Sequence, residues 1–262
     1  MVKTTIRIAL ATSLAAVICS TAAVGQDRDT GQGADAIERA AEANKYLFIF
    51  FYRTEDEGTT AVRKSFDAAL QGVSDQAMSV AVNITDPLEK AIVTRFGVAR
   101  APMPLILALA SNGAITKSFV QKFDEKQLDK AFISSGQEKC LKALQERKLV
   151  LLCVQNGDTQ HNAEALQGVE AFAADPRYAQ ATEVVKLDPS DEAEVEFLRR
   201  LKVDPKSAEA VTVLLAPPGR PIGTFKGAIT KNTLVAAAQK SASGCGPKGC
   251  GPKGCGPPKK KP

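Results

Sequence analysis

The sequence is poor in the side chains that build several common kinds of functional site. Its 262 residues contain no Trp, a single His (His161) and only 5% aromatic residues. Stacking platforms for single-stranded nucleic acid depend on aromatic side chains, and most catalytic metal sites depend on several histidines. At the same time 44% of the residues are hydrophobic and 24% are charged, as in ordinary globular proteins. The composition therefore excludes a wholly disordered chain and argues against a nucleic-acid partner.

The net charge of +5 comes from the two ends of the chain. Residues 1–26 carry Lys3 and Arg7 and no acid, and residues 240–262 carry six lysines and no acid. Between these ends acidic residues outnumber basic ones, so a basic groove for nucleic acid on the body is not expected. The lysines at the end suit contact with an anionic surface or an acidic partner.

The first 25 residues have the three parts of an export signal. Lys3 and Arg7 are followed by an apolar run, residues 8–18, and by small residues that end at Gly25. Cleavage there would deliver a chain to the periplasm or the exterior. An uncleaved anchor is less favoured because the run is short, and lipidation at Cys19 is less favoured because Ile18 precedes it. In an oxidising compartment, the five remaining cysteines would include at least one that is unpaired within the chain.

The body reads as the same order of elements twice. In the first half, helices are predicted over 36–46, 61–70 and 124–134 and from Asp86-Pro87 through Phe96, with strands over 46–52, 80–84, 105–109 and 115–119. The second half predicts helices over 137–146, 163–173 and 231–239, with strands over 149–154, 184–187, 211–215 and 222–225. Matching landmarks, 102 to 106 residues apart, are Lys45 with Lys148, Asp86-Pro87 with Asp188-Pro189, and Gly113 with Gly219. The spacing indicates a duplicated α/β unit whose sheet has helices on both faces.

This order resembles the thioredoxin fold in both halves. The most specific segments are KYLFIFFY and FGVARAPMPLILALASNG, where Pro102 or Pro104 would be the cis-proline of the family; Pro104 is slightly favoured. The second half has Ala210 at the position of Pro104. The resemblance predicts two thioredoxin-like domains, 35–135 and 137–240, with a groove beside the proline that receives an extended peptide.

The cysteine pair on which redox members of that family depend is missing. They carry C-x-x-C after the first core strand, where this chain has RTEDEGTT (53–60) and QNGDTQHN (155–162). Neither loop contains a cysteine, so conventional dithiol exchange there is ruled out. The resemblance thus implies the scaffold without its usual chemistry.

The remaining candidates on the body have ordinary structural explanations beside the functional ones. Cys140 and Cys153 flank a turn and predict either a disulfide or two small buried side chains. His161 is expected to be an exposed loop residue rather than a partner that activates Cys153. The acids 55–57 suit a hard cation or simple solvation, and Phe48, Phe50 and Phe51 are expected in the core. No nucleophile, base and orienting group are assembled, so an enzyme is not favoured.

The tail, 241–262, repeats Gly-Cys-Gly-Pro-Lys and predicts a flexible segment without a core. Its three evenly spaced cysteines, Cys245, Cys250 and Cys255, suit inter-chain disulfides or a soft metal such as Cu(I) or Zn(II), and the remaining alternative is an inert low-complexity segment. Two hypotheses follow from the whole sequence. The first is an exported binding or scaffold protein with a protein or peptide partner, and the alternative is thiol exchange or metal handling by the tail.

Overall fold

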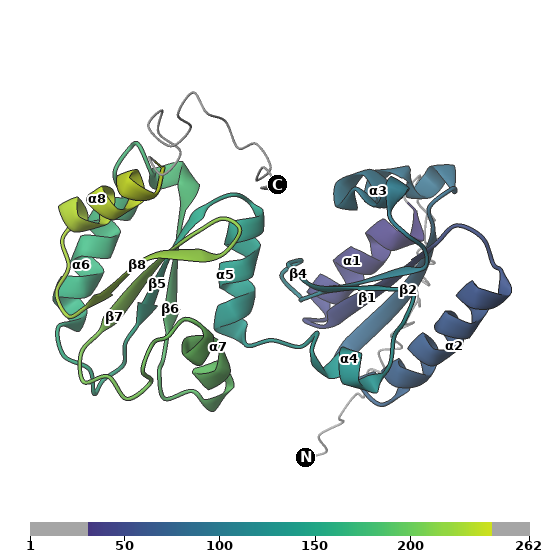
Figure 1. Ribbon diagram of the computed structural model, residues 1–262, viewed down its shortest axis with the longest axis horizontal. Coiled ribbons are helices and arrows are strands. Elements are labelled where there is room, and N and C mark those ends of the chain that lie inside the picture. Colours follow the sequence, from purple (N-terminus) through teal and green to yellow (C-terminus); the bar gives the residue numbers. More distant parts are fainter. Residues whose placement is uncertain (1–30, 243–262) are drawn as a thin grey trace, which may run out of the picture.

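The computed structural model describes residues 31–242, which form two α/β units in tandem (Figure 1). Unit 1 contains α1 (Gln32–Glu42), β1 (Tyr46–Tyr52), α2 (Glu57–Gln71), β2 (Ala77–Asn83), the 3₁₀ helix η1 (Pro87–Glu89), α3 (Lys90–Phe96), η2 (Val98–Arg100), β3 (Leu105–Leu109), β4 (Ile115–Val120) and α4 (Glu125–Asp129). Unit 2 contains α5 (Ser135–Gln145), β5 (Leu149–Val154), α6 (Asn162–Ala173), η3 (Ala179–Ala181), β6 (Thr182–Leu187), η4 (Glu192–Glu194), α7 (Val195–Arg200), β7 (Val211–Ala216), β8 (Arg220–Lys226) and α8 (Lys231–Ala242). Within this part of the chain, no helix combines the length and the apolar composition needed to cross a bilayer.

Each unit has one mixed sheet of four strands. The strand order is β2-β1-β3-β4 in unit 1 and β6-β5-β7-β8 in unit 2. The first pair in each sheet is parallel, and the other two pairs are antiparallel. This is the thioredoxin-like α/β arrangement, and the predicted fold class is confirmed in both halves.

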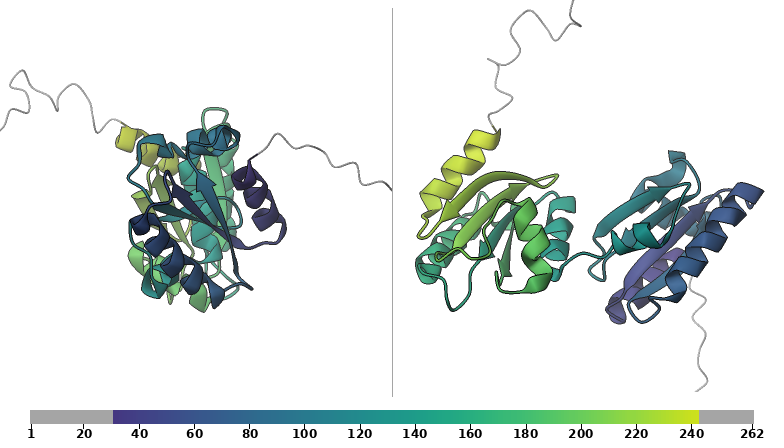
Figure 2. Two further views of the ribbon diagram at one scale, coloured as in Figure 1. Left: turned by 90° about the vertical axis from the view of Figure 1, so that its right-hand side faces the viewer. Right: turned by 60° about the horizontal axis from the view of Figure 1, so that its bottom comes forward.

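The core of each unit lies on both faces of its sheet because successive side chains of the central strand point in opposite directions. In β1, Leu47, Ile49 and Phe51 pack toward α1 and α3, whereas Phe48 and Phe50 pack toward α2. All five side chains are buried. The three phenylalanines are therefore core residues, and the helices cover both faces (Figure 2).

Several predicted helix bounds are wrong in unit 1. The helix predicted over 36–46 is α1, which ends at Glu42, because Asn44 has a left-handed backbone with φ 51° before β1 begins. The helix predicted over 124–134 is only α4, five residues long. After it Phe132 leaves the helical path and packs edge-on against Tyr46, with ring centroids 4.8 Å apart. In unit 2, α5 begins at Ser135, directly after Ser134 accepts as its N-cap.

The two units repeat the same order of strands, but one of the predicted pairs of equivalent residues is wrong. Asp86 caps η1 by accepting from the Leu88 N–H, and the residue that caps η4 in the same way is Asp191, not Asp188. Asp188 instead corresponds to Asn83: each accepts from the backbone and the hydroxyl of the residue two positions later. The predicted match of Asp86-Pro87 with Asp188-Pro189 is therefore wrong. The two dipeptides have the same sequence but lie at different turns of the repeated unit.

A buried glutamate holds the first helix of both units. Glu89 accepts from the Gly33 N–H at 3.2 Å, and Glu194 accepts from the Gly136 N–H at 2.6 Å. A side chain on either glycine would collide with the carboxylate, at 2.9 and 2.8 Å respectively. Burial raises the pKa of Glu89. Glycine at this helical position therefore lets a carboxylate reach N–H groups that have no partner inside the helix.

The two units touch along β4 and α5 (Figure 1). The Gln145 side chain of α5 pairs with the backbone of Ile115, accepting from its N–H at 2.9 Å and donating to its carbonyl at 2.7 Å. The Tyr46 hydroxyl forms a hydrogen bond with Glu138 and accepts from the Ile133 N–H at 3.1 Å. Burial raises the pKa of both Tyr46 and Glu138. These contacts tie the linker and α5 to the sheet of unit 1.

Candidate functional site

The loop after β1 and the segment before β3 lie at the same end of the unit 1 sheet. The last antiparallel pair of these strands joins Phe51 to Leu105, so the chain leaves β1 where it enters β3. The Arg53 guanidinium donates to the Ala99 carbonyl at 3.0 Å and connects the two segments. We call the surface formed by residues 53–59 and 101–104 the unit 1 loop face.

The start of α2 is capped by side chains that have no thiol chemistry. Asp56 is the N-cap, and its carboxylate accepts from the Thr59 N–H at 2.7 Å. Hydrogen bonds from the Thr59 backbone, and then from its hydroxyl, lower the pKa of Asp56. Asp56 and Thr59 are three residues apart at the beginning of this helix, which is the spacing and place of the cysteines in C-x-x-C. The acids 55–57 are exposed, and Asp56 serves as a cap.

A hollow of about 190 Å³ opens beside this cap. Tyr52, Glu55, Thr59 and Arg63 line it, and the Arg63 guanidinium lies over the Phe50 ring, 5.4 Å from its centroid. One aromatic wall and a cation beside a carboxylate can accommodate a single side chain of a bound peptide.

The segment before β3 differs at its two prolines. Pro104 is buried, follows a cis peptide bond and accepts from the Gln121 N–H at 2.9 Å, whereas Pro102 is exposed. Between them Met103 is half-buried. No other described residue forms a backbone hydrogen bond with Met103. The loop face thus contains a stretch of backbone at Met103 that has no backbone hydrogen bond to another described residue, and the hollow lies at the start of α2.

In unit 2 the loop after β5 and the segment before β7 are joined by backbone hydrogen bonds. The Gln160 N–H donates to the Ala208 carbonyl, and the Ala210 N–H donates to the Gln160 carbonyl, both at 2.9 Å. Gln160 and Glu209 thereby form a short parallel bridge. Ala210 holds the position of Pro104, and its carbonyl likewise accepts from Gly227 at 2.8 Å. Alanine has an N–H to give to the loop and proline has none, so only unit 2 can make this bridge.

Hydrogen bonds also hold the rest of the unit 2 loop. The Thr159 hydroxyl accepts from the Asn156 N–H at 3.0 Å, and the Asn156 amide donates to Asp188 at 3.0 Å. His161 has a left-handed backbone, φ 62°, and is exposed as expected. Cys153 is buried in the strand before this loop, so the two do not form a thiol–imidazole pair.

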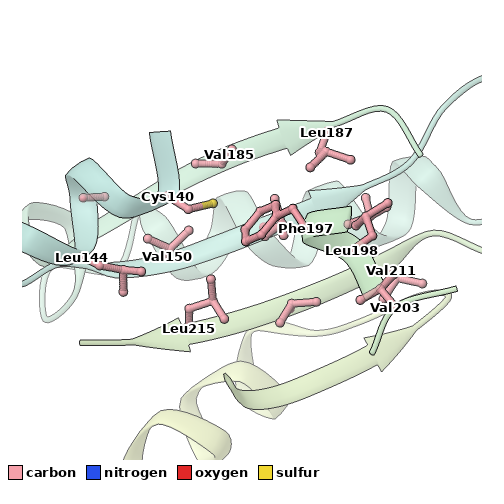
Figure 3. Close-up of a cluster of buried hydrophobic side chains, with 14 residues drawn as sticks. Cys140, Leu144, Val150, Val185, Leu187, Phe197, Leu198, Val203, Val211 and Leu215 are labelled. Atoms are coloured by element: carbon pink, nitrogen blue, oxygen red, sulfur yellow. The ribbon is translucent and has the colours of Figure 1, made fainter. Parts of the chain in front are cut away.

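Of the two alternatives for Cys140 and Cys153, the structure has two small buried side chains, and both thiols are free. Cys140 extends from α5 into the cluster that contains Val150 and Leu152 (Figure 3). Cys153 lies in the cluster on the opposite face of the sheet, with Leu151. The helix does pack on its own strand, but side chains of β5 alternate and the sheet separates the two sulfurs. Burial raises the pKa of Cys140 to about 12 and that of Cys153 to about 11, so both remain protonated thiols at neutral pH.

Other predicted sites lie outside the described residues. These are the export signal with Cys19, and the tail cysteines Cys245, Cys250 and Cys255. Within residues 31–242, no three His, Cys, Asp or Glu side chains are grouped so that they could hold a metal ion.

Neither a protein-family model nor a curated protein sequence matches the chain. Solved structures with a similar trace are thioredoxin-like. Deadhead, a germline-specific thioredoxin of Drosophila melanogaster, is 20% identical over 38% of this chain and 90% of its own, with a TM-score of 0.31. The first two thioredoxin domains of Saccharomyces cerevisiae Eps1p are 11% identical over 80% and 96%, with a TM-score of 0.30. The zinc-bound form of human ERp44 is 10% identical over 83% and 61%, with a TM-score of 0.35.

These superpositions are loose and the identities are low. The class of the protein follows from its own element order, strand order and helix placement in each half. The chain is a tandem pair of thioredoxin-like domains, and neither has a cysteine pair at the start of the helix after its first strand.

Proposed function

We propose that this protein is an exported binding module that takes up an extended peptide segment of a protein partner on the unit 1 loop face. The observation that carries the proposal is the difference between the loops. In unit 1 the Met103 backbone has no hydrogen bond to the loop after β1 and a hollow lies at the start of α2, whereas in unit 2 the segment before β7 is bonded to its own loop through Ala208 and Ala210. An extended peptide binds such a segment through its main chain, and nearby hollows select its side chains.

Redox catalysis by the body is not part of the proposal. Asp56 and Thr59 stand at the start of α2, and the two described cysteines are buried with raised pKa values. A buried thiol that remains protonated at neutral pH is a poor nucleophile.

The test is a peptide selection followed by matched substitutions. A phage library of random dodecapeptides is panned against the chain from residue 26, with its three tail cysteines replaced by serine, and enriched peptides are measured by calorimetry. Met103→Lys should weaken binding at least tenfold, whereas Glu209→Lys, at the corresponding place in unit 2, should leave it unchanged. Failure to enrich any peptide, or equal losses in the two variants, would contradict the proposal.

A second function is supported by the sequence of the tail. Three cysteines at five-residue spacing suit Cu(I), Zn(II) or cross-links to another thiol protein. Native mass spectrometry of the chain from residue 26, with and without reductant, separates these outcomes. Metal that disappears when Cys245, Cys250 and Cys255 become serine supports metal handling, and a reductant-sensitive dimer supports cross-linking. A metal-free monomer leaves peptide binding as the proposed function.

Export and surface contact belong to the same proposal. Residues 1–25 direct the chain to the periplasm or the exterior, and the lysines of the tail add contact with an anionic surface. N-terminal sequencing of the secreted or periplasmic protein should find Gln26 first. An intact Met1 in the soluble cytoplasmic fraction would contradict export.

A further inference from the structure

A hollow of about 600 Å³ lies between the two units. It is bounded by β4, the linker from α4 to α5, α5 itself and α7. Both units contribute to its walls, so neither unit forms it alone. Clefts of this size at the junction of two domains are the usual places for small organic ligands.

The walls combine apolar side chains with positive charge. Phe132, Leu141 and Phe197 provide the apolar surface. Phe197 is held in the unit 2 core at 8% exposure, and Phe132 packs against Tyr46 of unit 1. The apolar lining is therefore built on the two cores and does not depend on mobile surface chains.

Three cations surround this apolar lining: Lys117 from β4, Lys130 after α4 and Arg200 at the end of α7. None of them forms a salt bridge with another residue of the described range 31–242. The Arg200 guanidinium donates to the Gln137 side chain, which orients it beside α5. The acid that lines the hollow, Glu196, is already paired with Arg199 at 2.9 Å. The hollow therefore carries an excess of positive charge.

We propose that this hollow binds a small organic anion with an apolar, preferably aromatic, body. The anionic group would lie among Lys117, Lys130 and Arg200, and the body would contact Phe132, Leu141 and Phe197. Guanidinium and ammonium groups form charge-assisted hydrogen bonds with carboxylates, phosphates and sulfonates. The contacts of Gln145 with Ile115 and of Tyr46 with Glu138 hold the two walls at a fixed separation, so little ordering is needed on binding.

The probes are 2-naphthoate and its neutral counterpart 2-naphthylmethanol, titrated into the ¹⁵N-labelled chain from residue 26. We expect 2-naphthoate to bind with a Kd of about 1 mM or tighter, which is ordinary for a ligand of this size. Backbone amide signals of Phe132, Leu141 and Ala193 should shift, and the alcohol should bind at least fivefold more weakly. Equal binding of acid and alcohol, or no shifts at these residues, would overturn the proposal.

Matched variants separate local charge from the overall field of the protein. Arg200→Gln should weaken 2-naphthoate about tenfold, because a charge-assisted hydrogen bond is lost. Arg95→Gln changes the corresponding position of unit 1 and should leave the Kd within twofold. Lys130→Gln, on an exposed segment, provides a second variant if Arg200→Gln does not fold. The assignment would be overturned if Arg95→Gln weakened the binding of 2-naphthoate as much as Arg200→Gln, or if neither Arg200→Gln nor Lys130→Gln weakened it.

The main competing occupant is an acidic segment of a protein. An acetylated peptide of alternating Glu and Leu tests it in the same titration. If the peptide shifts these amides and 2-naphthoate does not, the hollow is a protein-docking surface and the small-anion proposal is wrong.

Discussion

The two units have the same elements around the loop that follows their first strand. They differ in whether this loop accepts a backbone hydrogen bond from the residue just before the third strand. In unit 2 the Ala210 N–H closes the loop through Gln160, whereas in unit 1 Pro104 has no N–H to offer. Unit 1 keeps only the Arg53 contact with Ala99 across the corresponding gap. The N–H of one residue thus distinguishes a loop that is hydrogen-bonded to the segment before the third strand from one that is not. Duplication preserved the scaffold, and the two copies can serve different roles.

The largest effect on stability is expected where α6 packs against α8 in unit 2. Gly168 of α6 lies so close to the chain before α8 that an added Cβ would be 2.0 Å from the Ile229 carbonyl oxygen. Gly168→Ala should therefore lower the free energy of unfolding of unit 2 by about 3 kcal/mol, because a backbone group has to move. Amide exchange resolved by unit should show the loss in unit 2 alone.

A matched control exists at Gly72, after α2, where an added Cβ meets nothing within 4 Å. Gly72→Ala should leave unit 1 within about 0.5 kcal/mol of the original protein. Similar effects for the two variants would mean that the close packing of α6 against the segment before α8 is not what stabilises unit 2.

Ala210→Pro should make the unit 2 loop resemble that of unit 1. The substitution removes the N–H that donates to Gln160 and should cost about 2 kcal/mol of unit 2 stability. Amide exchange over residues 155–162 should rise severalfold. Unchanged exchange in Ala210→Pro would contradict the role given to this hydrogen bond.

Alkaline pH should weaken unit 2 before unit 1. Thiols of an unfolded chain ionise near pH 9, whereas burial raises the pKa of Cys140 to about 12 and of Cys153 to about 11. The folded state therefore holds protons that the unfolded state has lost, and stability falls as the pH rises from about 9 toward 11. At pH 9.5 the loss should be about 1 kcal/mol for each thiol.

Urea unfolding at pH 8, 9 and 9.5 measures this dependence, and residues 31–134 provide the internal control because they contain no cysteine and their buried Tyr46, whose pKa is also raised, affects stability only from about pH 10. Cys153→Ala should reduce the dependence on pH, even though it lowers the stability at pH 8. If the slope of stability against pH were the same in this variant, the buried thiol would not be its source.

The smallest expected effect is that of Arg53→Gln. Its hydrogen bond to Ala99 is at the surface, so the free energy of unfolding should fall by no more than about 0.5 kcal/mol. The readout is local: amide exchange at Ala101 and Met103 should increase while the core strands remain protected. A loss of stability as large as that of Ala210→Pro would mean that the hydrogen bond from Arg53 to Ala99 holds the unit 1 loop as firmly as the Gln160 bridge holds the unit 2 loop.

The central strands were the most predictable part of the fold. The predicted ranges 46–52, 105–109 and 149–154 coincide with β1, β3 and β5, because strands buried on both faces are continuous apolar runs. The ends of helices were less predictable. The left-handed Asn44 after α1 is a local signal that ends helices and was not used, whereas the packing of Phe132 on Tyr46 is a tertiary contact that local patterns do not encode.

The site was predictable in part. The absence of cysteines after β1 and β5 could be read directly from the sequence, and so could Pro104 and its replacement by Ala210. The bridge through Gln160 could not, because it depends on how two distant loops meet. The choice between a disulfide and two buried thiols at Cys140 and Cys153 stayed open for a simpler reason: their positions along helix and strand were compared, but the face of the strand was not. Counting alternate residues from Leu152 would have placed Cys153 on the far side of the sheet.

The carboxamide of Gln145 has a consequence for any attempt to separate the two units. By pairing with Ile115 it acts as a one-residue extra strand on an outer strand that contains no proline. The outer strand of unit 2 has its own protection, because Pro221 interrupts its row of donors. Unit 1 cut away at residue 134 would therefore leave the Ile115 N–H and carbonyl without their partner, on an outer strand where another chain can pair. The second unit acts in this sense as an intramolecular guard against aggregation of the first.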